Sequence, residues 1–378
     1  MKTRRIGIDC RLSGIKHAGI GRYIQNLIIR IISKNKQTNW VFFFSNKSQF
    51  RKFEEAYLKL HNQKKLPDKL EIIFTPIKHY SIAEQLKLPK IFKDANLDLL
   101  HVPHFNIPIL YNQKIMITIH DLLWHEQKGI SVTTLNPLKY LLKYQAYKFI
   151  SKQAVHKACR IITPSETIKK VLFKYYPLVK SKISVVHEGI DENFSKHFAI
   201  KKNRKDSKQL IYTGSLYPHK NLILVLKALK KLSNIKLKLV GSRNVFQTRL
   251  LNTAKKLGVF NQVKVAGFLS DQKLIKEYKN SLAFVQPSLS EGFGLPALEA
   301  MSVGLPVLAS NIAIFKEIYR DIPIYFDPHN VDSLVRAINL SLTKDLSSKL
   351  REGKKLCENY SWDDMALKFN KIYQAESL

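Results

Sequence analysis

Hydrophobic and polar positions follow two alternating patterns along the chain. Short runs rich in β-branched and aromatic residues are each followed by a longer stretch with the spacing of a helix. This alternation predicts βα units and a parallel sheet. In the first half of the chain the predicted strands are Arg5–Cys10, Trp40–Ser45, Glu71–Pro76, Asp98–Pro103, Ile115–His120, Arg160–Pro164 and Ser184–His187.

A polar, lysine-rich stretch at residues 195–208 interrupts this alternation of strand and helix patterns, which resumes after it. The sequence therefore predicts a first α/β domain at 1–194, a basic linker, and a second α/β domain at 209–360. Ligand sites in open α/β sheets lie at the carboxyl ends of the strands, so we expect the site between the two domains. The predicted strands of the second domain are Gln209–Thr213, Lys236–Val240, Gln262–Gly267, Ala283–Pro287, Pro306–Ala309 and Pro323–Phe326.

The last stretch, residues 361–378, predicts a helix. Ser361 provides an N-cap, Asp364 follows three residues later, and apolar residues recur at helical spacing from Met365 to Tyr373. Two placements remain open for this helix. It either packs on the second domain or crosses back to brace the first.

The composition adds a strong positive charge. There are 63 Lys and Arg residues against 29 Asp and Glu, a net charge of +34, and 45% of the residues are hydrophobic. The apolar share excludes a wholly disordered chain. The charge suggests an anionic partner, although a lysine-rich composition would produce it without any function. We expect no nucleic-acid partner, because no helix-turn-helix, zinc-finger or aromatic RNA-binding motif is present.

Cellular location is constrained by what the sequence lacks. Cys10, Cys159 and Cys357 are too few and too widely spaced for a disulfide framework or a cysteine metal site. The N-terminal apolar run is too short for a signal peptide, and no run approaches the ~20 apolar residues of a membrane-spanning helix. We therefore expect a cytoplasmic protein, with any membrane contact peripheral.

The stretch Pro287–Ala300 carries the most specific chemistry. It follows an apolar strand, turns through two glycines, and enters a helix near Pro296. The amides of Gly294 and Leu295 would then lie at the positive end of that helix. Such an arrangement is suited to binding an anion such as a diphosphate.

Glu291 precedes this helix, and Glu299 is expected in its first turn, with seven residues between them. This spacing, with Phe-Gly and Leu-Glu-Ala at fixed places, resembles the Glu-x7-Glu signature of the retaining GT-B glycosyltransferases of family 4. The resemblance implies two Rossmann-like domains whose parallel sheets face each other across a deep cleft. It extends from Gly7 to Trp362 and is also carried by Gly19–Tyr23, Ile119–Leu122, Thr163–Ser165, His187–Asp191 and Tyr212–Asn221.

The resemblance implies a role for individual residues. Glu299 matches the glutamate that grips the ribose hydroxyls of the donor, and Glu291 matches the one that faces the donor sugar or the reacting centre. Lys220 matches the lysine that neutralises the leaving diphosphate. Gly214 and Ser215 belong to the same donor-binding loop, and Ser215 stands near the place where many members have an arginine, which we interpret as a subgroup trait.

Two further segments are implied as parts of the site. Gly19 and Gly21 are expected in a loop before a helix that starts near Arg22, where the backbone could approach a phosphate or the acceptor. The third glycine of a dinucleotide-binding fingerprint is missing, since Ile24 stands there, which disfavours a nicotinamide dehydrogenase. His120, at the carboxyl end of a strand, resembles the family histidine near the donor sugar.

We expect no metal and no cofactor other than the nucleotide-sugar co-substrate. The sequence has no Asp-x-Asp motif and no cluster with metal-ligand spacing, so Lys220 and helix amides would stabilise the leaving group. Members of the family retain the anomeric configuration of the sugar. The resemblance therefore implies retaining, metal-independent transfer.

The resemblance favours transfer of a hexose, preferably mannose from GDP-mannose, to a saccharide or lipid-linked saccharide in cell-surface polysaccharide synthesis. One alternative is a GT-B sugar-nucleotide epimerase. Another is a non-enzymatic polyanion-binding protein driven by the net charge. A glycosidase that uses the two glutamates would leave Lys220 without a role.

The stretch Pro137–Cys159 predicts a basic helix with interleaved tyrosines and lysines. Two interpretations are open. The helix lies on acidic lipid at the inner face of the cell membrane, or it packs on the first sheet with its lysines in water.

Overall fold

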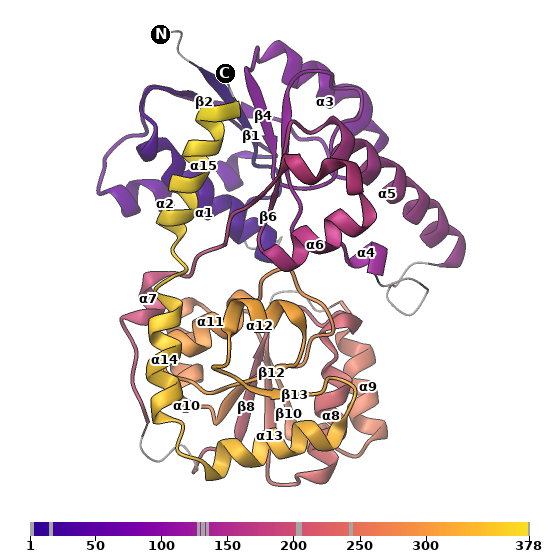
Figure 1. Ribbon diagram of the computed structural model, residues 1–378, viewed down its shortest axis with the longest axis vertical. Helices are drawn as coiled ribbons and strands as arrows, with labels where there is room; N and C mark the ends of the chain where they lie inside the picture. Colours follow the sequence, from indigo (N-terminus) through magenta and orange to yellow (C-terminus); the bar gives the residue numbers. More distant parts are fainter. Residues whose placement is uncertain are drawn as a thin grey trace. The chain divides into compact units, whose positions relative to one another are not determined.

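The computed structural model describes residues 4–14, 18–126, 129, 133, 136–201, 206–241 and 245–376. The chain divides into two compact units (Figure 1). Unit 1 comprises Met1–Trp124, Leu135–Glu188 and Trp362–Leu378, and unit 2 comprises His125–Thr134 and Gly189–Ser361. Each unit is built on one parallel sheet, which confirms the predicted α/β class.

The sheet of unit 1 has seven strands in the order β3-β2-β1-β4-β5-β6-β7. Its centre is buried on both faces, so β2 reads as a nearly continuous apolar run instead of an alternating one. The strands are β1 (Arg5–Asp9), β2 (Asn39–Phe44), β3 (Leu70–Phe74), β4 (Leu99–Val102), β5 (Ile115–Thr118), β6 (Arg160–Thr163) and β7 (Ile183–Val185).

Helices cover both faces of this sheet. They are α1 (Ala18–Lys34), α2 (Lys47–His61), α3 (Ile82–Asp94), α5 (Pro137–Lys157), α6 (Glu166–Tyr175), the short 3-10 helix η3 (Pro177–Lys182) and α15 (Trp362–Glu376), while the short α4 (Leu123–Glu126) spans the division between units. One core cluster joins the sheet to α3, α5 and α6 through side chains such as Phe92, Val155 and Leu172. These three helices therefore share one face of the sheet.

The C-terminal helix α15 packs in unit 1 against α1. Phe369 lies 6.2 Å from Tyr23, measured between ring centroids. The Asp363 carboxylate bridges Arg30, at 3.2 Å, and Lys34, at 2.8 Å. Residues at the far end of the sequence thus complete the packing of the first helix.

Unit 2 has a six-stranded sheet in the order β10-β9-β8-β11-β12-β13. The strands are β8 (Gln209–Thr213), β9 (Lys236–Val240), β10 (Val263–Gly267), β11 (Ala283–Gln286), β12 (Val307–Ser310) and β13 (Ile324–Phe326). The helices are α7 (Glu192–Ser195), η5 (Pro218–Lys220), α8 (Leu222–Lys231), α9 (Gln247–Lys256), η6 (Phe260–Gln262), α10 (Asp271–Asn280), α11 (Leu295–Ser302), α12 (Ala313–Tyr319), α13 (Val331–Thr343) and α14 (Ser347–Cys357).

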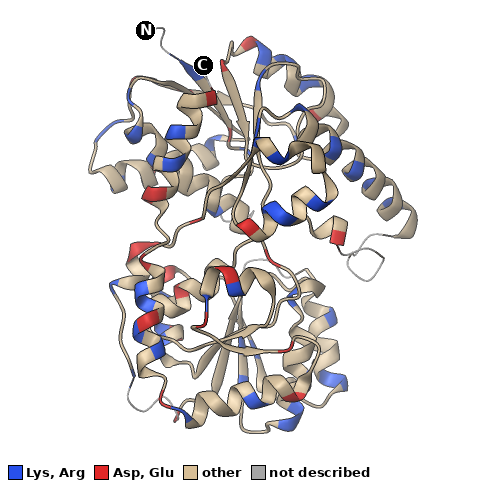
Figure 2. Ribbon diagram, viewed as in Figure 1, with Lys and Arg blue, Asp and Glu red and all other residues tan. Residues whose placement is uncertain are grey.

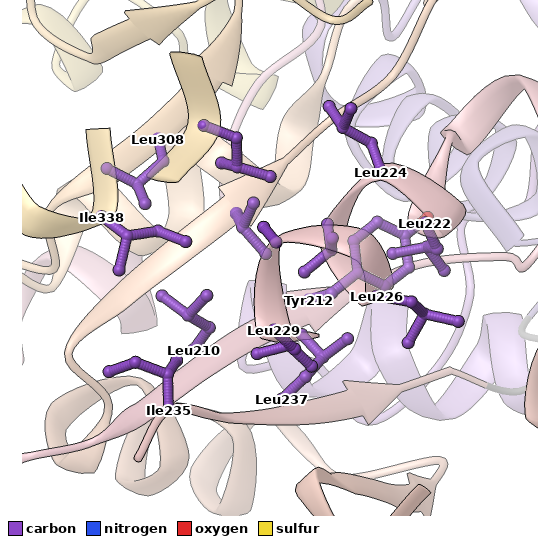
Figure 3. Close-up of a cluster of buried hydrophobic side chains, with 14 of the residues drawn as sticks. Leu210, Tyr212, Leu222, Leu224, Leu226, Leu229, Ile235, Leu237, Leu308 and Ile338 are labelled. Carbon is purple, nitrogen blue, oxygen red and sulfur yellow. The ribbon is translucent and has the colours of Figure 1, made fainter. Parts of the chain in front are cut away.

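A leucine-rich core holds unit 2 together (Figure 3). Leu210 and Leu237 of the sheet meet Leu226 and Leu229 of α8, with Ile338 of α13 beside them. All five side chains are fully excluded from water. This packing fixes β8 and β11 side by side, so the loops that follow the two strands emerge together.

The division between the units falls after Glu188, whereas the sequence places the end of the first domain at 194. The intervening segment packs within unit 2: the Ile190 amide donates to the Tyr360 carbonyl, and Phe194 contacts Tyr278. Residues 202–205 of the predicted linker lie outside the described residues. In the described part of the chain, no helix combines the length and hydrophobicity needed to cross a bilayer.

Candidate active site

The central contact of the candidate site is an ion pair between Lys220 and Glu291. Lys220 ends the short helix η5, which follows β8, and Glu291 lies in the loop after β11. Their Nζ and Oε2 atoms are 2.6 Å apart, and both side chains are largely buried. The adjacency of β8 and β11 brings these two residues together across 71 positions of sequence.

Hydrogen bonds hold the Glu291 carboxylate in place. Its Oε1 atom accepts from the Ser288 hydroxyl at 2.8 Å and from the Gln286 amide at 3.3 Å. Burial raises the pKa of Glu291, but the charge and hydrogen bond of Lys220 outweigh this effect and hold the pKa below its usual value. Glu291 is therefore a carboxylate at neutral pH, and it fixes the position of the Lys220 ammonium.

His219, next to Lys220, is not a proton carrier at neutral pH. Burial and the neighbouring Lys220 charge lower its pKa to about 3. Its backbone carbonyl accepts from the Leu289 amide at 2.8 Å. This bond ties the loop after β8 to the loop after β11.

Gly294 and Leu295 form the start of α11. Gly294 has a φ of 99° and caps the helix, with Pro296 in its first turn as predicted. A Cβ atom on Gly294 would lie 1.9 Å from the Tyr319 hydroxyl oxygen, so no larger residue fits without a shift. The Ala297 amide donates to the Gly294 carbonyl at 3.2 Å and is already in use. The amide of Leu295 lies at the positive end of the helix, where an anion would be stabilised.

Tyr319 of α12 clamps this loop. Its hydroxyl lies 2.6 Å from the Gly294 carbonyl and 3.0 Å from the Gln286 side-chain oxygen. Burial raises the pKa of Tyr319 well above its usual value, so the hydroxyl keeps its proton and donates. A chain of contacts thus links Tyr319 through Gln286 to Glu291.

Glu299 lies deeper in the helix than the sequence suggests. The helix α11 begins at Leu295, so Glu299 is its fifth residue and belongs to the second turn, not the first. Its side chain is 2% exposed, whereas a residue that only complements a helix dipole would face water. The expectation of the first turn was wrong because the capping residue is Gly294, so the helix begins at Leu295 and not at Pro296.

Gly214 and Ser215 follow β8 at the same edge of the sheet. Gly214 has a φ of 148°, and its carbonyl would lie 2.3 Å from a Cβ atom on Gly241. The Ser215 carbonyl accepts from the Tyr212 hydroxyl at 2.6 Å. The loops after β8 and β9 therefore approach each other backbone to backbone, with no room for side chains.

The two N-terminal glycines lie in unit 1, and the structure corrects their setting. The helix α1 begins at Ala18, so Gly19 and Gly21 are in its first turn and not in a loop that ends near Arg22. The Gly14 amide donates to the Gly21 carbonyl at 3.2 Å, and a Cβ atom on Gly21 would lie 2.0 Å from the Gly14 oxygen. Gly21 is thus required for close packing of the preceding loop.

His120 also lies in unit 1, just after β5. Its Nδ1 atom is 3.4 Å from Glu188 Oε1, and its Nε2 atom is 3.2 Å from the Pro103 carbonyl oxygen. The ring of Tyr23 meets the His120 ring edge to face, with centroids 4.6 Å apart. The imidazole is 11% exposed and held on three sides, so its orientation is fixed.

Among the described residues, the structure contains no group of three or more histidine, cysteine or acidic side chains arranged to hold a metal ion. Glu291 is engaged with Lys220, and Glu188 is engaged with His120. The arrangement supplies a positive charge and helix amides, which suit an anionic ligand.

Both halves of the chain match models of known protein families. Residues 18–194 match the model described as Glycosyltransferase Family 4, and residues 193–357 match Glycosyl transferases group 1. This chain belongs to the family 4 glycosyltransferases. These matches confirm the family that the Glu-x7-Glu spacing resembles. They also confirm the prediction that the protein is an enzyme.

Relatives and solved structures agree with this assignment. The glycosyltransferase is 28% identical over 295 residues to the O-antigen chain mannosyltransferase RfbU of Salmonella typhimurium, covering 77% of each chain. Its fold matches sucrose-phosphate synthase of Thermosynechococcus elongatus with a TM-score of 0.75, 16% identity and 98% coverage of both chains. It also matches HepE of Anabaena, solved with UDP-glucose, with a TM-score of 0.72, 14% identity and coverage of 98% and 99%. The predicted GT-B fold is confirmed.

Some residues of the site were not singled out from the sequence. Ser288 and Gln286 orient Glu291, and Tyr319 clamps Gly294. Glu188 beside His120 lies in one of the family-like segments, which was the only available signal. Tyr319 lies in a later helix of the glycosyltransferase and carries no local motif, so only the packing of α12 reveals its role.

Proposed function

We propose that this glycosyltransferase moves a hexose from a nucleotide sugar to a saccharide or lipid-linked saccharide acceptor in cell-surface polysaccharide synthesis. The observation that carries the proposal is the buried Lys220–Glu291 pair beside the start of α11. Mannose from GDP-mannose is the favoured donor, supported by the similarity to a mannosyltransferase that acts on O-antigen chains. HepE binds UDP-glucose on the same fold, so the nucleotide base is part of the test.

We assign the donor's diphosphate to Lys220 and the amide end of α11. An ammonium has three N–H donors, so Lys220 can keep Glu291 and still bind phosphate oxygens. Positive charge held in a buried place stabilises the negative charge that develops on the leaving diphosphate. Gly214 and Ser215 would line the phosphate path, and Glu299 would accept hydrogen bonds from the ribose hydroxyls.

We further propose that transfer is retaining and needs no metal. Glu291 is fixed by Lys220, Ser288 and Gln286, which suits a carboxylate that orients sugar hydroxyls more than one that attacks carbon. The leaving phosphate would take the acceptor's proton. His120, fixed by Glu188 and Tyr23, would bind the donor sugar, and Gly19 and Gly21 would bring backbone close to donor or acceptor.

The place of action follows from the acceptor. A lipid-linked saccharide is presented at a membrane, so we propose that the enzyme is cytoplasmic and associates peripherally with the inner face of the cell membrane. The domain of residues 1–194 would hold the acceptor and that of residues 209–360 the donor.

Nucleotide binding tests the proposal directly. GDP, UDP, ADP and their sugar conjugates are compared by calorimetric unfolding at fixed salt. A ligand at 100 times its Kd adds about 2.7 kcal/mol to the free energy of unfolding. We expect a selective rise with one base, largest for GDP and GDP-mannose, that Glu299→Gln abolishes.

The matched control is Glu352→Gln, on the exposed side of α14, which should leave the shift unchanged. Equal small shifts with every polyanion would contradict the proposal and favour binding by net charge alone. Turnover of a sugar nucleotide in the absence of any saccharide acceptor would favour an epimerase.

A further inference from the structure

The helix α5 carries an apolar stripe that faces away from its own domain. Leu138, Leu141, Leu142 and Phe149 are 69%, 51%, 64% and 54% exposed. At 3.6 residues per turn, positions 138, 142 and 149 lie on one side of the helix. The buried residues of α5, which include Tyr147, Ser151 and Ala154, lie on the opposite side. Figure 1 shows α5 at the outer edge of unit 1.

Lysines border this stripe on both sides. By helical position Lys139 flanks one edge, and Lys148 and Lys152 flank the other; all three are exposed. The sequence contains no Asp or Glu between Glu126 and Glu166, although it has six lysines and one arginine there. In Figure 2, α5 carries basic residues, drawn in blue, and no acidic residues, which are drawn in red. The stripe is therefore apolar at its centre and positive at its edges.

Apolar exposure continues on the elements beside α5. The segment that contains Leu110 lies between α3 and α5, because Gln85 of α3 bonds with Ile107 and Ile109 while Lys157 of α5 bonds with Ile109. Leu110 is 56% exposed, and Ile82 and Leu86 of α3 are 79% and 65% exposed. Since α3 and α5 pack on one face of the sheet, these side chains extend the same side of unit 1.

We propose that the outward stripe of α5 is a docking surface for an anionic lipid bilayer. Leucine and phenylalanine side chains enter the acyl boundary, and the flanking lysines reach the headgroups with their stems along the apolar surface. A second copy of the chain fits poorly, because its lysines would face those of the first. The inference rests on the membrane association proposed above and names the surface that makes it.

A tryptophan placed within the stripe provides a probe of this contact. Phe149 is 54% exposed in the stripe, whereas Trp124 lies against Tyr147 on the opposite side of α5. Vesicles of phosphatidylcholine with phosphatidylglycerol should shift the emission of the Phe149→Trp variant to shorter wavelength, and those of phosphatidylcholine alone should not. The unaltered protein should bind the same anionic vesicles with a smaller shift, as followed by flotation.

Two sets of surface variants separate the apolar and the charged contribution. Each lysine near an anionic surface contributes roughly a fivefold factor, so Lys139→Glu, Lys148→Glu and Lys152→Glu together should weaken binding at least about 100-fold. Leu138→Gln, Leu142→Gln and Phe149→Gln together should weaken it at least about tenfold. All six side chains are exposed, so the fold should be kept.

Matched controls lie in unit 2. Lys227→Glu, Lys256→Glu and Lys273→Glu change the net charge equally. Ile223→Gln, Phe268→Gln and Leu340→Gln remove three apolar side chains that are 40%, 57% and 37% exposed. Neither control should weaken binding by more than about twofold, since surface effects away from a contact are small.

Three results would overturn the proposal. The first is no binding to anionic vesicles at low salt, and the second is equal weakening by the unit 2 controls, which would mean that net charge alone acts. The third is self-association that the Leu138, Leu142 and Phe149 changes abolish, which would make the stripe a protein interface. Transfer to a water-soluble acceptor is measured in parallel: it should persist in all α5 variants, and its absence in the unaltered protein would instead refute the proposed function.

Discussion

At the scale of single residues, the position of Lys220 depends on Glu291. The pair is buried, and Lys220 is the cation that we assign to the leaving diphosphate. Lys220→Met should lower kcat about 10²- to 10³-fold at saturating donor, the usual loss when one preorganised stabilising group is removed. The measurement is the initial rate of sugar transfer, and EDTA should leave the rate of the unaltered enzyme unchanged.

The control for this change is Lys231→Met. Lys231 also forms an ion pair in unit 2, with Asp332, but both side chains are more than half exposed, so little change in rate or stability is expected. A Lys220→Met enzyme with full kcat would place leaving-group stabilisation elsewhere. A rate lost with EDTA would contradict metal independence.

At the scale of elements, α15 completes the core of unit 1. Phe369 is fully buried, and its ring stacks 5.4 Å from His101 and meets Tyr23. Phe369→Ala should therefore lower the free energy of unfolding of unit 1 by about 3–5 kcal/mol. All three tryptophans, Trp40, Trp124 and Trp362, lie in unit 1, so urea unfolding followed by tryptophan fluorescence measures this unit.

The same helix offers its own control. Leu367 is 43% exposed, so Leu367→Ala should change the unfolding midpoint little. If both variants unfolded at the same urea concentration, α15 would not be part of the cooperative core of unit 1.

At the scale of the whole molecule, buried neutral histidines make stability depend on pH. His101 bonds with Tyr373 at 2.6 Å and Thr118 at 2.9 Å, and burial together with nearby His120 lowers its pKa to about 3. In the unfolded chain the pKa returns to about 6.5, so the unfolded state binds more protons between these values. Stability is then full above about pH 6.5 and is lost as the pH falls toward 3.

The expected slope for unit 1 is up to about 1.4 kcal/mol per pH unit below the unfolded pKa of His101. Urea midpoints between about pH 7.5 and 5 measure it, a range in which most carboxylates stay ionised in both states. His101→Gln should reduce the slope by up to about 1.4 kcal/mol per pH unit, which is the contribution of one proton. An unchanged slope in that variant would assign the acid sensitivity to other groups.

Local patterns in the sequence were sufficient to predict most of the strands and helices. Each predicted strand of both units is present to within one or two residues, because short runs rich in β-branched and aromatic residues are a local signal for a strand. The start of α5 at Pro137, after the Asn136 cap, also follows from local rules. Local rules failed at α1, where Gly19 and Gly21 lie inside the helix, since the close approach of Gly14 is a tertiary contact.

The sequence by itself determined the two parallel sheets, the family and the identity of the candidate donor residues, because all of these depend on spacing within short segments. Only the tertiary structure decided which residues meet. It paired Lys220 with Glu291, supplied Gln286, Ser288 and Tyr319 as supports, and packed α15 on α1. These contacts join residues far apart in the chain, and their partners are set by strand order and helix packing, which no local pattern encodes.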